Sequence, residues 1–105
     1  MDREETLNLE LIPFFKCCAD YGKAVEDYCL EEAYPGVTST SYFITVKAAW
    51  MDDLGLYEIL EYLFERLFES TSVETRKKVF GIRVRNSSID LHKLKEQNIR
   101  NSYMY

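Results

Sequence analysis

The sequence predicts an α+β fold, a two-layer sandwich that is either ferredoxin-like or a three-stranded variant. A length of 105 residues suits a single domain with one hydrophobic core. A content of 47% hydrophobic residues with only 4 Gly and 2 Pro is typical of a folded chain. Segments with period-two apolar alternation are separated by segments with helical spacing, which gives the order β-α-β-α-β-α. We therefore expect residues 1–105 to form one domain, with a C-terminal tail, residues 99–105, that is either held by its aromatic side chains or mobile.

The N-terminal segment predicts a strand. Leu7, Leu9 and Leu11 alternate with polar residues, a pattern that is typical of a strand with one buried face. A helix that continues into the following element is the alternative interpretation.

A helix is expected next, from Pro13 to about Ala33. Proline fits the first turn of a helix, and apolar side chains then recur at spacings of three and four residues. Cys18 and Cys29 are eleven positions apart, which places both on the buried side of this helix. The sequence Tyr34-Pro35-Gly36 ends the helix, because proline cannot continue it.

The clearest strand is predicted over Tyr42–Trp50, after a connector rich in Thr and Ser. Alternate residues of this segment are apolar and should form its core face. This core face consists of Tyr42, Ile44, Val46, Ala48 and Trp50.

A second amphipathic helix follows, with Asp52 or Asp53 as its N-cap. Its apolar stripe consists of Leu56, Leu60, Leu63, Phe64 and Leu67. The opposite side is largely acidic and carries Glu58, Glu61, Glu65 and Glu69.

The last third of the chain is basic. The triplet Arg76-Lys77-Lys78 precedes a third strand, in which Phe80, Ile82 and Val84 alternate with other residues. The alternate positions are Gly81, Arg83 and Arg85, so one face of this strand should be wet and positive. Ser87 or Ser88 then precedes a short helix that contains Ile89, Leu91 and Leu94.

No cofactor or metal is expected. Cys17, Cys18 and Cys29 form an odd set without C-x-x-C spacing, and the single histidine, His92, does not complete a standard zinc pattern. Such a set of cysteines favours a reducing compartment, the cytoplasm. The acidic start of the chain does not resemble a secretory signal, and no apolar run approaches the roughly 20 residues of a membrane span.

The sequence does not predict an enzyme. His92 lacks a G-x-S-x-G or Cys-His context that would activate a nucleophile, so we expect it at the surface. Asp52 and Asp53 could share acid–base chemistry only in a cleft that separates their pKa values, and capping is the simpler role. The sequence contains no glycine-rich phosphate-binding motif.

Charge is the most informative feature. Residues 1–75 contain 5 Lys/Arg and 16 Asp/Glu, a net charge of −11, whereas residues 76–105 contain 8 Lys/Arg and 2 Asp/Glu, a net charge of +6. An acidic field speeds encounter with a basic partner and repels nucleic acid. Exposed tyrosines often anchor protein interfaces. The predicted partner-binding residues are Asp52, Asp53, Tyr57, Glu58, Glu61, Tyr62, Glu65 and Glu69.

These features predict a small acidic protein-binding domain. The favoured function is stoichiometric inhibition of a basic toxin or nuclease, because the chain resembles bacterial immunity proteins in size and charge. A homodimeric regulatory or chaperone-like adaptor is the alternative. The third hypothesis is a nucleic-acid-associated module that uses residues 76–85, although the strand face there lacks an aromatic at Gly81. The same cations could instead pair with acidic helices of this chain or of a second copy.

Overall fold

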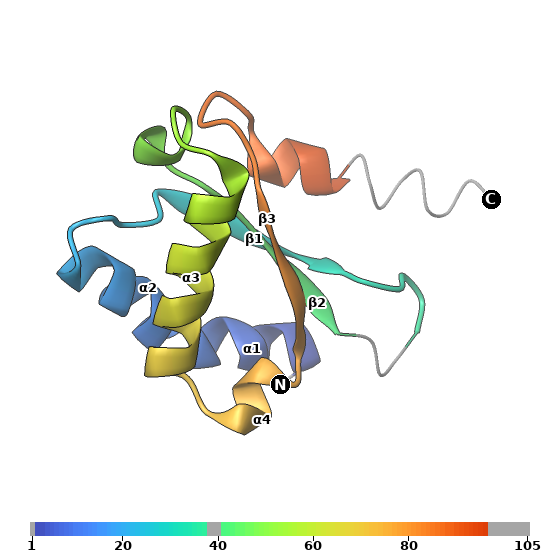
Figure 1. Ribbon diagram of the computed structural model, residues 1–105. Coiled ribbons are helices and arrows are strands. Elements are labelled where there is room, and N and C mark those ends of the chain that lie inside the picture. Colours follow the sequence, from blue (N-terminus) through green and yellow to red (C-terminus); the bar gives the residue numbers. More distant parts are fainter. Residues whose placement is uncertain (1, 38–40, 97–105) are drawn as a thin grey trace.

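In the computed structural model, which describes residues 2–37 and 41–96, two helices precede the first strand (Figure 1). The elements in chain order are α1 (Arg3–Glu10), α2 (Ile12–Asp20), β1 (Asp27–Glu32), β2 (Tyr42–Lys47), the 3₁₀ turn η1 (Ala49–Met51), α3 (Leu56–Ser70), α4 (Val73–Arg76) and β3 (Val79–Val84). Residues 91–96 are also helical.

The three strands form one mixed sheet with the order β1-β2-β3. β1 runs antiparallel to β2, with Cys29 opposite Thr45, and β2 runs parallel to β3, with Ile44 opposite Ile82. A parallel pair needs a crossover connection, which α3 and α4 supply. The α+β class is therefore confirmed, whereas the predicted order β-α-β-α-β-α is wrong because the chain begins with helices.

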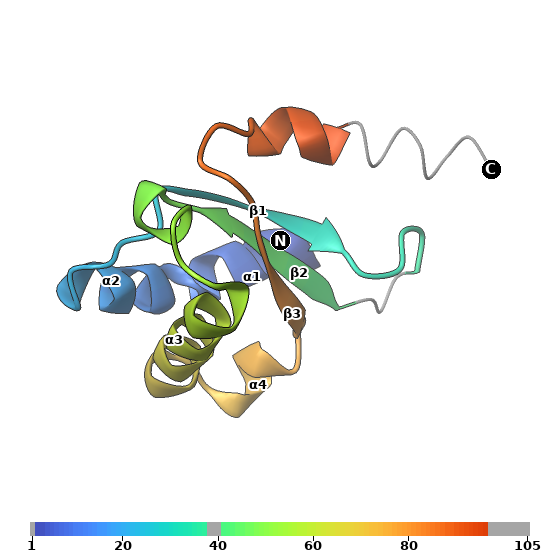
Figure 2. The same cartoon turned by 45° about the horizontal axis from the view of Figure 1, so that its top comes forward.

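Helices α1, α2 and α3 lie on one side of the sheet, and the core is between them (Figure 2). β2 contributes Ile44 and Val46, which are fully buried, as the sequence predicts for its apolar face. The strand is shorter than predicted because the chain turns into η1 after Lys47. Trp50 lies in that turn, where its indole N–H donates to the carbonyl of Ala24 at 2.8 Å.

The predicted strand at Leu7–Leu11 is wrong, and the alternative helical interpretation is confirmed by α1. Asp2 caps this helix, because its carboxylate accepts a hydrogen bond from the backbone N–H of Glu5 at 2.8 Å. Leu7 and Leu11, four residues apart, are fully buried, whereas Leu9 is 53% exposed. Leucines at every second position thus resemble the pattern of a strand, but in the helix only the i,i+4 pair, Leu7 and Leu11, faces the core.

The long helix predicted from Pro13 to Ala33 is also wrong. α2 ends at Asp20, and Gly22 then adopts a φ of 79°, a conformation that side chains with a Cβ rarely tolerate. Of the remaining residues, Asp27–Glu32 form β1, so Cys18 and Cys29 lie on different elements. Both are nevertheless buried, as predicted.

The C-terminal segment packs on the other face of the sheet. Leu91 is fully buried, and its carbonyl lies 3.8 Å from the Sγ of Cys29. Lys47 donates from Nζ to the carbonyl of Ile89 at 2.6 Å. Asp90 begins the helical segment by accepting from the N–H groups of His92 and Lys93, each at 3.1 Å. The predicted tail, residues 99–105, lies outside the described residues.

We expect Leu63→Ala to lower the free energy of unfolding by about 2–5 kcal/mol, because this α3 side chain is fully buried in the core. The matched control is Leu56→Ala in the same helix, where a half-exposed side chain should cost no more than about 0.5 kcal/mol. Urea unfolding followed by circular dichroism measures both changes. Equal losses in the two variants would show that this description of the core is wrong.

Candidate partner-binding surface

The two sides of α3 differ sharply in exposure. Ile59, Leu63 and Leu67, spaced four residues apart, are buried against the sheet and α2. Glu58, Glu61, Glu65 and Glu69 are all exposed, as the sequence predicts. The buried stripe differs from the predicted one at its start, because Ile59 rather than Leu56 faces the core.

Apolar side chains are exposed at the start of α3. Tyr57 is 82% exposed, Leu56 is 58% exposed and Leu54 is 40% exposed. They are adjacent in sequence to exposed carboxylates, and Tyr57 and Glu61 are one helical turn apart. We define the α3 surface as Asp53, Leu54, Leu56, Tyr57, Glu58 and Glu61.

A pocket of about 200 Å³ lies between the start of α3 and the end of β3. Its apolar lining includes Leu54, Leu56 and Val84, and Asp52 and Arg85 contribute charged groups. Two residues of the α3 surface therefore also line a hollow that could accept a side chain of a partner. The sequence analysis missed this pocket, because it depends on residues from two elements that are distant in the chain.

Asp52 does not cap α3, contrary to expectation. The N-cap is Gly55, which has no side chain to accept a hydrogen bond from the first turn of the helix. Asp52 instead accepts hydrogen bonds from the backbone N–H of Ser87, at 2.9 Å, and from the Ser87 hydroxyl. The hydrogen bond from the Ser87 hydroxyl, which has the larger effect, and the one from the Ser87 backbone N–H both lower the pKa of Asp52. Its carboxylate therefore remains charged beside the pocket.

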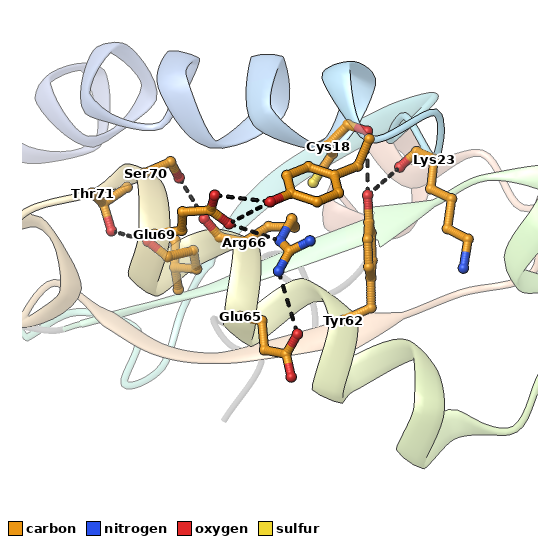
Figure 3. A network of polar contacts seen from close by, with 10 residues as sticks. Cys18, Lys23, Tyr62, Glu65, Arg66, Glu69, Ser70 and Thr71 are labelled. Carbon is orange, nitrogen blue, oxygen red and sulfur yellow. Dashed lines mark hydrogen bonds and ion pairs between the residues drawn. The ribbon is translucent and has the colours of Figure 1, made fainter.

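Two of the predicted partner-binding residues, Tyr62 and Glu69, contact the C-terminal end of α2, whereas Glu65 pairs with Arg66 of α3 itself (Figure 3). The guanidinium of Arg66 lies 3.3 Å from Glu65 and 3.2 Å from Glu69, and it packs 3.8 Å from the ring centre of Tyr21. Glu69 also accepts from the Tyr21 hydroxyl at 2.9 Å. Glu65 and Glu69 are thus partly neutralised by a cation that the sequence analysis did not single out.

Tyr62 contacts the end of α2 through its hydroxyl. Its hydroxyl lies 3.2 Å from the carbonyl of Cys18 and 3.4 Å from that of Lys23, and donates to them (Figure 3). Burial raises the pKa of Tyr62 to about 12, so the hydroxyl remains a donor at physiological pH. Its ring meets Trp50 edge to face with 5.4 Å between centroids. Tyr62 therefore links α3 to the end of α2 through its hydroxyl and to η1 through its ring.

Much of the basic charge of the C-terminal third is used within the fold. Lys78 pairs with Glu10, Lys95 pairs with Glu4, and Lys77 lies 3.7 Å from Glu74. Arg76 covers the ring of Phe68, with 4.6 Å to its centre, and donates to the carbonyl of Thr71. The interpretation in which these cations pair with this chain's own acidic residues is therefore confirmed for Lys77 and Lys78, whereas Arg76 contacts a ring and a backbone carbonyl. No ion pair joins Glu58 or Glu61 to another described residue.

The positive face predicted for β3 carries aromatic rings as well. The Phe43 ring lies over Gly81, where an added Cβ would meet it at 3.4 Å. Phe80 packs edge to face against Phe43, with centroids 4.9 Å apart, and Arg83 stacks on the same ring at 3.7 Å. Arg83 also lies 3.5 Å from Glu31. The aromatic ring that the sequence lacks at Gly81 is therefore supplied by Phe43 of β2.

The nucleophilic and metal-ligating groups show no sign of activation. Burial raises the pKa values of Cys18 and Cys29 to about 11, so both remain protonated thiols at neutral pH. His92 is exposed, as expected, and lies 3.6 Å from Asp27 beside a second pocket of about 310 Å³. Among residues 2–37 and 41–96, no group of three His, Cys, Asp or Glu side chains is placed to hold a metal ion.

The sequence matches no protein-family model, and no curated protein or solved structure is significantly similar to it. The described residues contain no helix that is both long and apolar enough to cross a membrane.

We expect Arg66→Met to lower the free energy of unfolding by about 1–2 kcal/mol, because methionine keeps the packing but loses the stacking and ion pairing. Lys16→Met on exposed α2 surface is the control and should be close to neutral. Thermal unfolding of both variants tests this. A neutral Arg66→Met variant would mean that the Arg66 contacts do not hold α3 to α2.

Stability should also depend on pH through Glu10. Its hydrogen bonds from Lys78 and then Thr75 lower its pKa below the ordinary 4.5. The stabilisation is therefore fully present above about pH 4.5 and is lost as the pH falls through the lowered pKa. Glu10→Gln should destabilise the protein at pH 7 and converge with wild type in acid. Glu58→Gln is the control, and urea midpoints across pH should show no such convergence for it.

Proposed function

We propose that this protein is a small acidic binding domain that inhibits a basic protein, such as a toxin or nuclease, by covering its active surface. The observation that carries the proposal is the α3 surface. Tyr57 is its most exposed large apolar side chain, and Glu58 and Glu61 have no ion-pair partner among the described residues. A large aromatic group beside uncompensated carboxylates suits a basic protein surface.

The distribution of charge supports an acidic docking face over a basic one. Lys77, Lys78 and Arg83 each have an acidic partner within the fold, which partly compensates three of the five cations of residues 76–85 and disfavours phosphate binding there. The protonated state of the buried thiols also favours a binding role over catalysis by cysteine. A reducing compartment such as the cytoplasm would suit the three free cysteines.

The test compares two doubly reversed variants that have the same net charge. Glu58→Lys with Glu61→Lys changes the α3 surface, whereas Glu5→Lys with Asp20→Lys changes exposed positions on α1 and α2. Each tagged protein is used to capture partners from extract of its own cells at low and high salt, and captured proteins are identified by mass spectrometry. The association rate with each recovered partner is then measured.

We expect wild type and the Glu5/Asp20 variant to recover the same basic protein at one-to-one stoichiometry. The Glu58/Glu61 variant should bind it at least about tenfold more slowly, with a weaker dependence on salt. The recovered protein should lose its activity when mixed with an equal amount of wild type. Equal association of all three forms, or full activity of the complex, would contradict the proposal.

A further inference from the structure

Residues 86–96, which we call the strap, lie on the outer face of the sheet, opposite to α1, α2 and α3 (Figure 2). Leu91 is the only buried residue of the strap, and its carbonyl oxygen lies 3.8 Å from the Sγ of Cys29. Both residues are buried, yet neither belongs to the core between the sheet and the helices. The strap therefore covers a small apolar contact that is separate from the core.

The polar contacts of the strap involve side chains that are partly or largely exposed. Each contact joins the strap to a different part of the fold. The pairs are Ser87 with Asp52, Ile89 with Lys47, His92 with Asp27 and Lys95 with Glu4. Exposed contacts of this kind each contribute little to stability.

Packing beneath the strap is also incomplete. The pocket of about 310 Å³ lies where the strap meets α1 and β1. Its lining includes His92 and Lys95 of the strap, Asn8 of α1 and Cys29 of β1. Atoms that line a hollow lack packing partners on that side, so the strap is held less firmly than the elements of the core.

We propose that the strap opens as a unit while the core stays folded, and that it thereby gates access to Cys29. Opening exposes one buried leucine, whereas unfolding exposes the whole core. Segments with few buried contacts open at a lower free energy than the complete domain. Asp52 connects this motion with the pocket beside the α3 surface, because it lines that pocket and holds Ser87 near the start of the strap. The proposal does not depend on the function proposed above.

Cys29 and Cys18 are a matched pair of reporters. Both are buried, and burial raises the pKa of each thiol to about 11, so neither reacts while it is covered. Iodoacetamide is added to the folded protein at concentrations where labelling is proportional to reagent, so that the rate reports the population of the open form. Mass spectrometry of fragments measures each cysteine separately.

We expect Cys29 to be labelled at least about a hundredfold faster than Cys18, because Cys18 becomes accessible only when the core unfolds. Labelling of Cys29 should also depend much less on urea, because opening of the strap exposes little surface. Equal rates for the two thiols, or the same urea dependence for both, would show that the strap does not open separately.

Two variants separate opening from unfolding. Leu63→Ala weakens the core equally in the closed and open forms, so Cys18 should be labelled at least about tenfold faster while the rate at Cys29 stays unchanged. Leu91→Ala weakens only the closed strap and should speed labelling of Cys29 at least about tenfold. If Leu63→Ala accelerated both thiols equally, the proposal would be wrong. The comparison of the two thiols in wild type does not require either variant.

The connection through Asp52 is tested with Asp52→Ala, and Asp53→Ala is the control at an exposed neighbouring carboxylate. Asp52→Ala removes the acceptor for Ser87, so Cys29 should be labelled about threefold faster or more. Asp53→Ala should leave this rate unchanged. Equal labelling of Cys29 in the two variants would overturn the connection between the pocket and the strap.

Discussion

The fold depends on one strand that is buried on both of its faces. β2 directs Ile44 and Val46 into the helical core, and Thr45 is equally inaccessible on the other side. A hydroxyl buried in this way needs a partner, which is Glu31 of β1 at 2.7 Å. Glu31 in turn lies 3.5 Å from Arg83 of β3. This chain of polar contacts crosses all three strands and fixes their order from the outer face, while the apolar side chains fix it from the core.

The same principle organises the charges of the whole molecule. The acidic first part and the basic last part of the sequence meet in the fold, because Glu10, Glu4 and Glu31 each pair with a cation from beyond residue 75. These three pairs join segments that are distant in the sequence. Glu58 and Glu61 on α3, and also Glu5, Asp20 and Glu32 on other elements, form no ion pair with another described residue, so the electrostatic character of the molecule cannot be read from net charge alone.

The sequence predicted the elements whose patterns admit one interpretation. α3 and the core face of β2 have long, regular apolar repeats, and both are confirmed. Leu7, Leu9 and Leu11 fit two periods equally well, and only the Asp2 cap and the packing of α1 decide between them. The end of α2 depends on the positive φ of Gly22, while Cys29 joins β1 because β2 is available to pair with it. Such tertiary partners override local spacing.

The candidate site shows the same limit of local pattern. Eight residues shared an acidic or aromatic character in one stretch of sequence, but the fold gives them different roles. Tyr62 and Glu69 contact the C-terminal end of α2, and Glu65 and Glu69 pair with Arg66. Tyr57, Glu58 and Glu61 face outward from the same helix. The four exposed glutamates of α3 therefore differ in whether an ion pair with a described residue compensates them, a difference that their spacing in the sequence does not reveal.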